Sequence, residues 1–161
     1  GIRITGDGSS VPGEREGLKE EPSQSLALAL EAFLSASNTQ TYVALMAYLA
    51  PSKRHGLLLG RLRSRIRDRY HVATTLGYGP RFLHSTGQLH KGGGRNGRFI
   101  QMTIDEKQDI TIPGAPYSFG ILKRAQALGD FHSLVRHRLH VLDIRLGKDV
   151  ETGLEWVLQA L

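Results

Sequence analysis

The chain of 161 residues contains no cysteine at all. This absence excludes disulfides, thiolate metal sites and cysteine nucleophiles, and it fits a reducing cytoplasm. No apolar run approaches the roughly 18–20 residues of a membrane span, so no membrane partner is expected. The longest apolar run, residues 42–50, predicts a buried strand. The first residues show no basic stretch followed by an apolar one, so we expect no secretory signal.

Aromatic residues make up only 7% of the chain, whereas its formal net charge is +6. A basic balance attracts nucleic acid, acidic lipid or small phosphorylated ligands, and charge alone does not choose among them. Part of the excess of positive charge comes from five arginines at alternate positions from Arg61 to Arg69. On a helix this spacing distributes them over several directions. With few aromatics available for base stacking, we interpret them as a solvated helix surface and expect no nucleic-acid partner.

The length suits one domain with a sizeable core. Residues 1–22, rich in Gly, Glu, Lys, Pro and Ser, predict a linker that includes a short edge strand over residues 2–5. Residues 23–161 predict the folded domain. The start at Gly1, without methionine, suggests a piece of a longer polypeptide, although processing or tag removal would look the same.

Helix and strand patterns alternate through the folded region. Helices are predicted from a cap at Ser23 or Ser25 to Asn38, and then over about 53–70, 118–129, 130–138 and 149–161. The last three are expected to be capped by Ser118, Asp130 and Asp149. The expected apolar faces are Leu58, Leu62 and Ile66 in the helix over 53–70, and Ile121, Leu122, Ala125 and Leu128 in the helix over 118–129. Strands are predicted over 41–49, 72–76, 98–104, 109–112 and 139–146. This alternation predicts an α/β fold, a three-layer α/β/α sandwich of flavodoxin-like type with a mainly parallel sheet.

Residues 77–94 form the most unusual stretch, because two imidazoles, a lysine, two hydroxyls and an amide stand among glycines. The stretch follows the carboxyl end of a predicted strand, where open α/β sheets bind ligands. Glycine lets the backbone approach a ligand closely. Polar side chains beside a cation suit an anionic or polyhydroxylated ligand, so we expect a binding site here. Arg81 fits two interpretations equally, as an anion contact or as the partner of a carboxylate.

Other side chains in this stretch have competing interpretations. We interpret Thr86 as a helix cap, whereas Ser85 and Gln88 either contact a substrate or cap the helix. His90 is equally compatible with a structural and a functional role. No third possible metal ligand has a sequence spacing from His84 and His90 that is typical of a metal site, so we expect no metal site. The remaining histidines on ordinary helix and strand positions are interpreted as structural: His132, His137 and His140.

Residues 72–88, Val-Ala-Thr-Thr-Leu-Gly-Tyr-Gly-Pro-Arg-Phe-Leu-His-Ser-Thr-Gly-Gln, resemble the C-terminal part of bifunctional transaldolase/phosphoglucose isomerase proteins. Residues 117–120 and 125–131 look similar too, and the likeness runs from about Ser23 to the end. Phosphoglucose isomerases are built from two sugar-isomerase (SIS) subdomains, so the resemblance implies an SIS-type domain. It also implies interconversion of glucose 6-phosphate and fructose 6-phosphate through a cis-enediol, with a glutamate base and no metal or organic cofactor.

The resemblance also implies roles for individual residues. The family has a glutamine followed seven residues later by a catalytic lysine, and His84 and Lys91 have that spacing here. Lys91 is therefore implied as the lysine near the sugar's ring oxygen. His84, which departs from the family's glutamine, is implied as a polar contact to the sugar. Ser85, Gln88 and Arg81 are further candidates for substrate binding.

The implied partners are a hexose phosphate and an upstream isomerase or transaldolase portion of the same polypeptide. The family's general base and its Ser/Thr phosphate loop are expected upstream, outside this chain, so we expect no turnover by the chain alone. The family is dimeric, which makes a homodimer one expectation. The alternative hypothesis is a non-catalytic regulatory module that binds a sugar phosphate.

Overall fold

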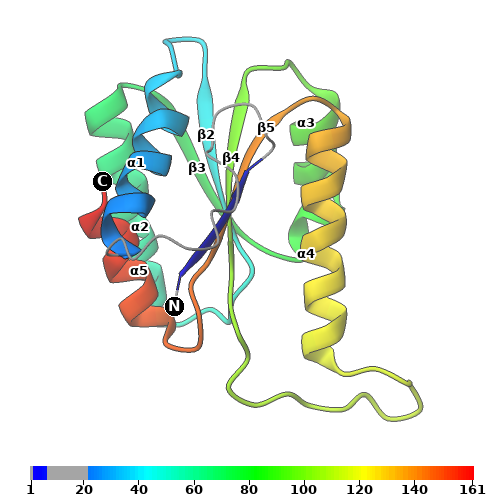
Figure 1. Ribbon diagram of the computed structural model, residues 1–161. Coiled ribbons are helices and arrows are strands. Elements are labelled where there is room, and N and C mark those ends of the chain that lie inside the picture. Colours follow the sequence, from blue (N-terminus) through cyan, green and yellow to red (C-terminus); the bar gives the residue numbers. More distant parts are fainter. Residues whose placement is uncertain (1, 7–21) are drawn as a thin grey trace.

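The computed structural model of the protein describes residues 2–6 and 22–161 (Figure 1). Most of the predicted linker, residues 1–22, therefore lies outside the described residues. The elements in chain order are β1 (Arg3–Gly6), α1 (Pro22–Ser35), β2 (Tyr42–Ala47), α2 (Lys53–Tyr70), β3 (Ala73–Tyr78), the 3-10 helix η1 (Arg81–Leu83), α3 (Ser85–Gly92), β4 (Gly97–Thr103), α4 (Phe119–Arg136), β5 (His140–Arg145) and α5 (Val150–Gln159).

The strands form one sheet in the order β1-β5-β4-β2-β3. The pairs β2·β3, β2·β4 and β4·β5 are parallel, whereas β1 pairs antiparallel with β5 at the edge. Helices α1, α2 and α5 cover one face of this sheet, and α3 and α4 cover the other (Figure 1). The arrangement confirms the predicted three-layer α/β/α sandwich, and β1 confirms the predicted edge strand.

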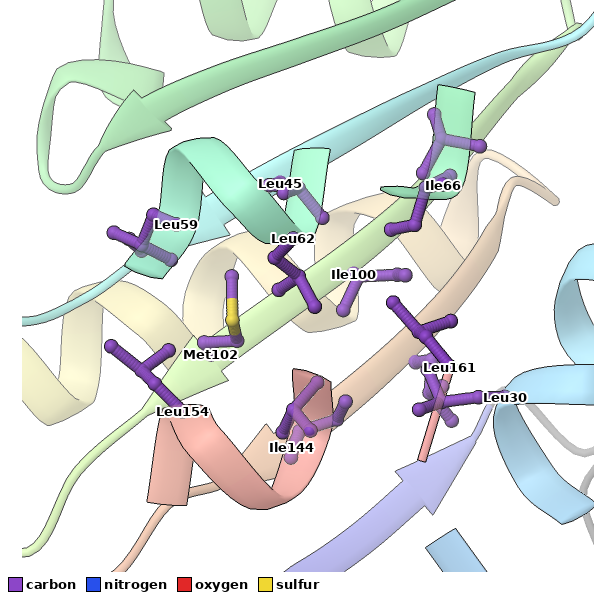
Figure 2. Close-up of a cluster of buried hydrophobic side chains, with 14 of the residues drawn as sticks. Leu30, Leu45, Leu59, Leu62, Ile66, Ile100, Met102, Ile144, Leu154 and Leu161 are labelled. Carbon is purple, nitrogen blue, oxygen red and sulfur yellow. The ribbon is translucent and has the colours of Figure 1, made fainter. Parts of the chain in front are cut away.

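The larger core lies between the sheet and helices α1, α2 and α5. Successive strand residues point to opposite faces, so every second residue of β2, β4 and β5 meets these helices. Figure 2 shows ten of the buried side chains by name: Leu30, Leu45, Leu59, Leu62, Ile66, Ile100, Met102, Ile144, Leu154 and Leu161. Burial of each large apolar side chain contributes about 1.5–3 kcal/mol, so this layer supplies much of the stability.

The opposite face has a smaller core, in which Ala44, Met46, Phe99 and Val141 of the strands meet α4 and η1. In the part of the chain that the structure describes, α3 and α4 are the helices on this face of the five-stranded sheet (Figure 1). Two hollows, one beside α3 and one beside α4, lie on this side of the sheet.

Helix α2 and the N-caps of two later helices agree with the sequence patterns. Helix α2 spans the predicted residues 53–70, and its side chains at Leu58, Leu62 and Ile66 are buried as expected. Ser118 and Asp149 cap α4 and α5, since their side chains accept bonds from backbone N–H groups three residues on. These features are local in sequence, which is why a pattern of residues predicts them.

Other local predictions were wrong. Helix α1 begins at Pro22, so Ser23 and Ser25 lie inside it, consistent with the preference of proline for the first helical position. The residues expected to form a strand over 109–112 make only an isolated bridge, Thr111 to Ser118. Asp109 instead bonds the backbone of Gly120 at the start of α4, which draws this segment to the helix rather than to the sheet.

The two helices predicted over 118–129 and 130–138 are one continuous helix, α4. A single glycine inside a helix costs only about 1 kcal/mol relative to alanine, so Gly129 does not end it. The apolar face also differs from the prediction: Ile121, Ala125 and Leu128 are exposed, and Leu122 is only partly buried. The buried positions are Gly120, Ala127, Asp130 and Leu134.

Among residues 2–6 and 22–161, no helix has the length and apolar character needed to cross a bilayer.

Candidate functional site

The stretch 77–94 folds into short elements that place Lys91 next to α4. Strand β3 ends at Tyr78, a cis peptide joins Gly79 to Pro80, and η1 then leads into α3. His84 is the N-cap of α3 and makes no side-chain capping bond, and Thr86 lies inside the helix. The expectation that Thr86 caps this helix was therefore wrong. Lys91 lies in the last turn of α3.

Two glycines of this stretch are required because other atoms of the protein lie where their side chains would be. A Cβ on Gly79 would come within 2.4 Å of the Tyr48 ring, and one on Gly87 would come within 1.5 Å of the Phe82 carbonyl oxygen. Side-chain atoms do not tolerate such distances, so both positions require glycine. We expected glycine here to admit a ligand, and at these two positions it admits a ring and a backbone instead.

A buried carboxylate organises the centre of the site. The ammonium of Lys91 donates to Asp130 Oδ1, and the hydroxyl of Tyr48 donates to Asp130 Oδ2. The side chain of Asp130 is 1% exposed and that of Lys91 is 20% exposed. Both oxygens of the carboxylate are therefore engaged, while part of the lysine still meets solvent. Burial, followed by the contacts with Asp130, raises the pKa of Tyr48, which keeps its hydroxyl protonated as a donor.

His90, the residue before Lys91, is buried on the other side of α3. Its Nδ1 lies 2.9 Å from the hydroxyl of Tyr42, and its ring stacks on Tyr42 and meets Phe99 edge to face. Burial lowers the pKa of His90, the charge of Lys91 lowers it further, and Asp130 opposes both effects. These contacts are those of a neutral histidine that packs α3 against the sheet, which favours the structural interpretation.

Lys91 lines an open hollow of ≈ 390 Å³ between α3 and the end of α4. The other lining residues are Phe82, Gly87, Gln88, Gly92 and His137. Two of the five candidate site residues, Lys91 and Gln88, thus share this hollow.

The remaining three candidates lie elsewhere. His84, Ser85 and Arg81 are exposed around the start of α3 and do not line the hollow. Seven residues separate His84 from Lys91, which corresponds to about 10 Å along a helix at 1.5 Å per residue. Of the candidate residues, the hollow is therefore lined by Lys91 and Gln88, while His84 lies at the opposite end of α3.

Asp130 is the residue that the sequence patterns misplaced. We expected it to cap a short second helix, whereas it lies in the middle of α4 and points to the sheet. The signal was present in the spacing of Ala127, Asp130 and Leu134, at i, i+3 and i+7, which places all three on one helical face. This spacing is informative only for a helix that continues through Gly129, as α4 does.

The arrangement can hold a positive charge in a fixed place beside a surface hollow. An ammonium anchored in this way can donate to an anionic oxygen or to an ether oxygen that gains negative charge. Asp130, by contrast, is enclosed and already bonded, so it orients Lys91 rather than contacting a ligand. Within the part of the chain that the structure describes, no group of three or more His, Asp or Glu side chains is placed to hold a metal ion.

No protein-family model matches the chain, and no curated protein matches it in sequence. Among solved structures, the chain is similar to the hypothetical protein TT0462 from Thermus thermophilus, with a TM-score of 0.65 and 18% sequence identity. The likeness covers 91% of this chain and 40% of that chain, so this chain spans less than half the length of its neighbour. At this identity the likeness concerns the α/β fold alone.

Proposed function

We propose that the chain is the SIS-type domain of a cytoplasmic glucose-6-phosphate isomerase, to which it supplies Lys91, and that it does not turn over hexose phosphate alone. The observation that carries the proposal is the ion pair between Lys91 and the buried Asp130. It anchors an ammonium at the edge of a hollow, with Gln88 beside it as a hydrogen-bonding neighbour. The α/β fold and the resemblance of residues 72–88 support the same proposal.

The chemistry assigned to Lys91 is help in opening the sugar ring. The ring oxygen becomes more negative as its bond to C1 breaks, and a nearby ammonium stabilises that charge and supplies a hydrogen bond. Asp130 orients the amine by accepting its hydrogen bond, and the hydroxyl of Tyr48 satisfies the second oxygen of Asp130. The proton that leaves C2 and returns to C1 is carried by a glutamate that the proposal places upstream, outside this chain.

A coupled assay on the 161-residue chain tests the statement about turnover. Fructose 6-phosphate is supplied with an excess of glucose-6-phosphate dehydrogenase and NADP⁺, and NADPH is followed by absorbance. We expect no rate above the blank, because the general base is missing. Robust isomerisation would show that the chain holds a complete active site and would refute this part of the proposal.

Binding tests the role of Lys91. Glucose 6-phosphate is titrated into the ¹⁵N-labelled chain, and we expect shift changes that centre on Gln88, Lys91 and Gly92. Lys91→Gln removes the charge, so the affinity should fall roughly tenfold or more, as loss of a charged hydrogen bond predicts. Lys53→Gln, on the opposite side of the sheet, is the matched control. Absence of shifts around α3, or an equal affinity for both variants, would contradict the proposal.

The second candidate is a non-catalytic module that binds a sugar phosphate and regulates a partner. The same ion pair favours it, because an amine held by a carboxylate can bind an anion without helping in a reaction. Lys91→Ala in the full-length protein separates the two candidates. Loss of rate with binding retained indicates catalysis, whereas loss of binding in a protein without isomerase activity indicates a sensor.

A further inference from the structure

A second hollow, of ≈ 330 Å³, lies between α4 and strands β4, β5 and β1. It shares no lining residue with the hollow around Lys91. We call it the α4 cavity.

The floor of the α4 cavity is a row of polar side chains on three neighbouring strands. Thr5 pairs with Asp143 in the β1·β5 register, and Asp143 pairs with Gln101 in the β5·β4 register. Two residues further along, Arg145 pairs with Thr103. All five residues line the cavity. The inward face of a sheet is usually apolar where a helix packs on it, so this row is unusual.

Gln101 leaves a hydrogen-bond acceptor unused. The residue is 1% exposed, and its Nε2 donates to the carbonyl oxygen of Ala127 and to Asp143 Oδ1, both at 3.1 Å. A flipped amide would turn its oxygen toward these two acceptors, so the orientation is fixed. No donor among the described residues reaches Oε1. A buried acceptor without a donor costs about 1–3 kcal/mol. Oε1 has almost no accessible surface, so a ligand hydroxyl recovers this cost only when the amide shifts toward the cavity.

Asp143 offers a second acceptor beside Gln101. Burial raises the pKa of Asp143, while hydrogen bonds from Gln101 and Thr103 and the charge of Arg145 lower it. Burial outweighs these contacts, so a ligand hydroxyl that donates a further hydrogen bond to the carboxylate would stabilise its charged form.

The walls and the mouth of the cavity differ from its floor. The walls are apolar and include Ala127, Leu128 and Phe131 of α4, which suit the C–H face of a sugar ring. The mouth carries two cations of α4: Lys123, which pairs with Glu106, and Arg124 next to it. Arg145 of the floor pairs with Asp105. Ammonium and guanidinium groups suit a phosphate or a carboxylate group.

We infer that the α4 cavity binds a small polyhydroxylated molecule that carries an anionic group. Its hydroxyls donate to Gln101 and Asp143, its C–H face rests on Phe131, and its anionic group lies near Lys123 and Arg124. This inference does not rest on the isomerase proposal, because the residues assigned to the ligand differ from those of the Lys91 hollow. The two sites are neighbours, since Tyr48, which donates to Asp130, also lines the α4 cavity.

Titrations into the ¹⁵N-labelled 161-residue chain test the inference. The probes are 6-phosphogluconate, which has hydroxyls and anionic groups, inorganic phosphate, which has only the anion, and myo-inositol, which has only the hydroxyls. We expect saturable shift changes at the Gln101 side-chain amide, Asp143, Ala127 and Phe131 with 6-phosphogluconate, and weaker binding of the other two.

Three outcomes would overturn the inference. One is the absence of shifts at the cavity with every probe. The second is binding of inorganic phosphate as tight as that of 6-phosphogluconate, which would mean an anion site without recognition of hydroxyls. The third is a set of shifts confined to Gln88 and Lys91, which would leave the isomerase proposal standing while refuting this one.

Variants give an independent check. Leu128 lines the cavity and is 53% exposed, so Leu128→Trp narrows the mouth with little cost to folding. Leu28→Trp on α1, where the leucine is 66% exposed, is the matched control. Gln101→Met removes the acceptor at similar volume, together with the amide donor to Ala127 and Asp143, so its folding is checked by circular dichroism. Leu128→Trp and Gln101→Met should each weaken 6-phosphogluconate about tenfold, equivalent to ~1.4 kcal/mol, and the control should not. Unchanged affinity in both cavity variants would sink the inference.

Discussion

Replacement of Asp130 by alanine is the most informative single change in this protein. The carboxylate is the common acceptor for Lys91 and Tyr48, which lie 39 and 82 residues away in sequence. In Asp130→Ala both donors lose their partner at once. The two donors differ in access to water: the hydroxyl of Tyr48 is enclosed with its ring, whereas Lys91 keeps a fifth of its side chain in solvent.

The expected loss of stability follows from these two donors. A buried hydroxyl without an acceptor costs about 1–3 kcal/mol. The Lys91 ammonium can turn toward water, so it adds less than the full cost of a broken buried pair. Together they give about 3–4 kcal/mol, at the lower end of the range for breaking a buried ion pair. Asp130→Asn retains one acceptor oxygen and should cost about half as much, and Tyr48→Phe about 1 kcal/mol.

Urea unfolding followed by circular dichroism measures these differences as shifts in the midpoint at constant slope. Glu155→Ala is the control, since Glu155 pairs with Arg54 at 2.7 Å and both side chains are well exposed. Exposed pairs contribute about 0–1 kcal/mol, so the control should lose little. If Asp130→Ala costs no more than Glu155→Ala, the carboxylate does not organise this site and the reasoning about Lys91 fails with it.

Three further changes test other parts of the structure. Gly87→Ala should destabilise the protein by more than about 2 kcal/mol in urea unfolding, because its Cβ would strike the Phe82 carbonyl oxygen, whereas Gly92→Ala, with open space around it, should be neutral or slightly stabilising. Burial lowers the pKa of His90 in the folded protein below its value in the unfolded chain. The unfolded state therefore takes up the proton first as the pH decreases, and the free energy of unfolding decreases with it. Unfolding free energies measured from about pH 7.5 to about 5 should therefore fall more steeply in the natural protein than in His90→Gln, and equal slopes would contradict this. Ser118→Ala should cost about 1 kcal/mol in the same assay, because the side chain of Ser118 caps α4, and no loss would argue against that cap.

The candidate site was predictable in part. Lys91 and Gln88 were singled out because polar side chains stood among glycines after a strand, and both line one hollow. Asp130 was missed because an aspartate after a glycine is typical of a helix N-cap, and this pattern hid its place on the buried face of α4. A helix was expected in this stretch, but its cap was assigned to Thr86, whereas the N-cap of α3 is His84.

The α4 cavity could not have been found in the sequence, because its floor depends on register. Thr5, Gln101 and Asp143 come from three strands far apart in the chain, and only the pairing of those strands places them in one row. A shift of one residue in either register would turn one of them to the other face.

The sequence by itself determined the alternation of helices and strands, the extent of α2 and the caps at Ser118 and Asp149, because each depends on residues within a few positions of one another. The tertiary structure alone decided that Lys91 and Tyr48 both donate to the buried carboxylate of Asp130. It also decided that a row of polar side chains on the sheet lines the cavity beside α4. These contacts join segments that are far apart in the chain, so no local pattern of residues predicts them. They form only when the helices pack against the sheet.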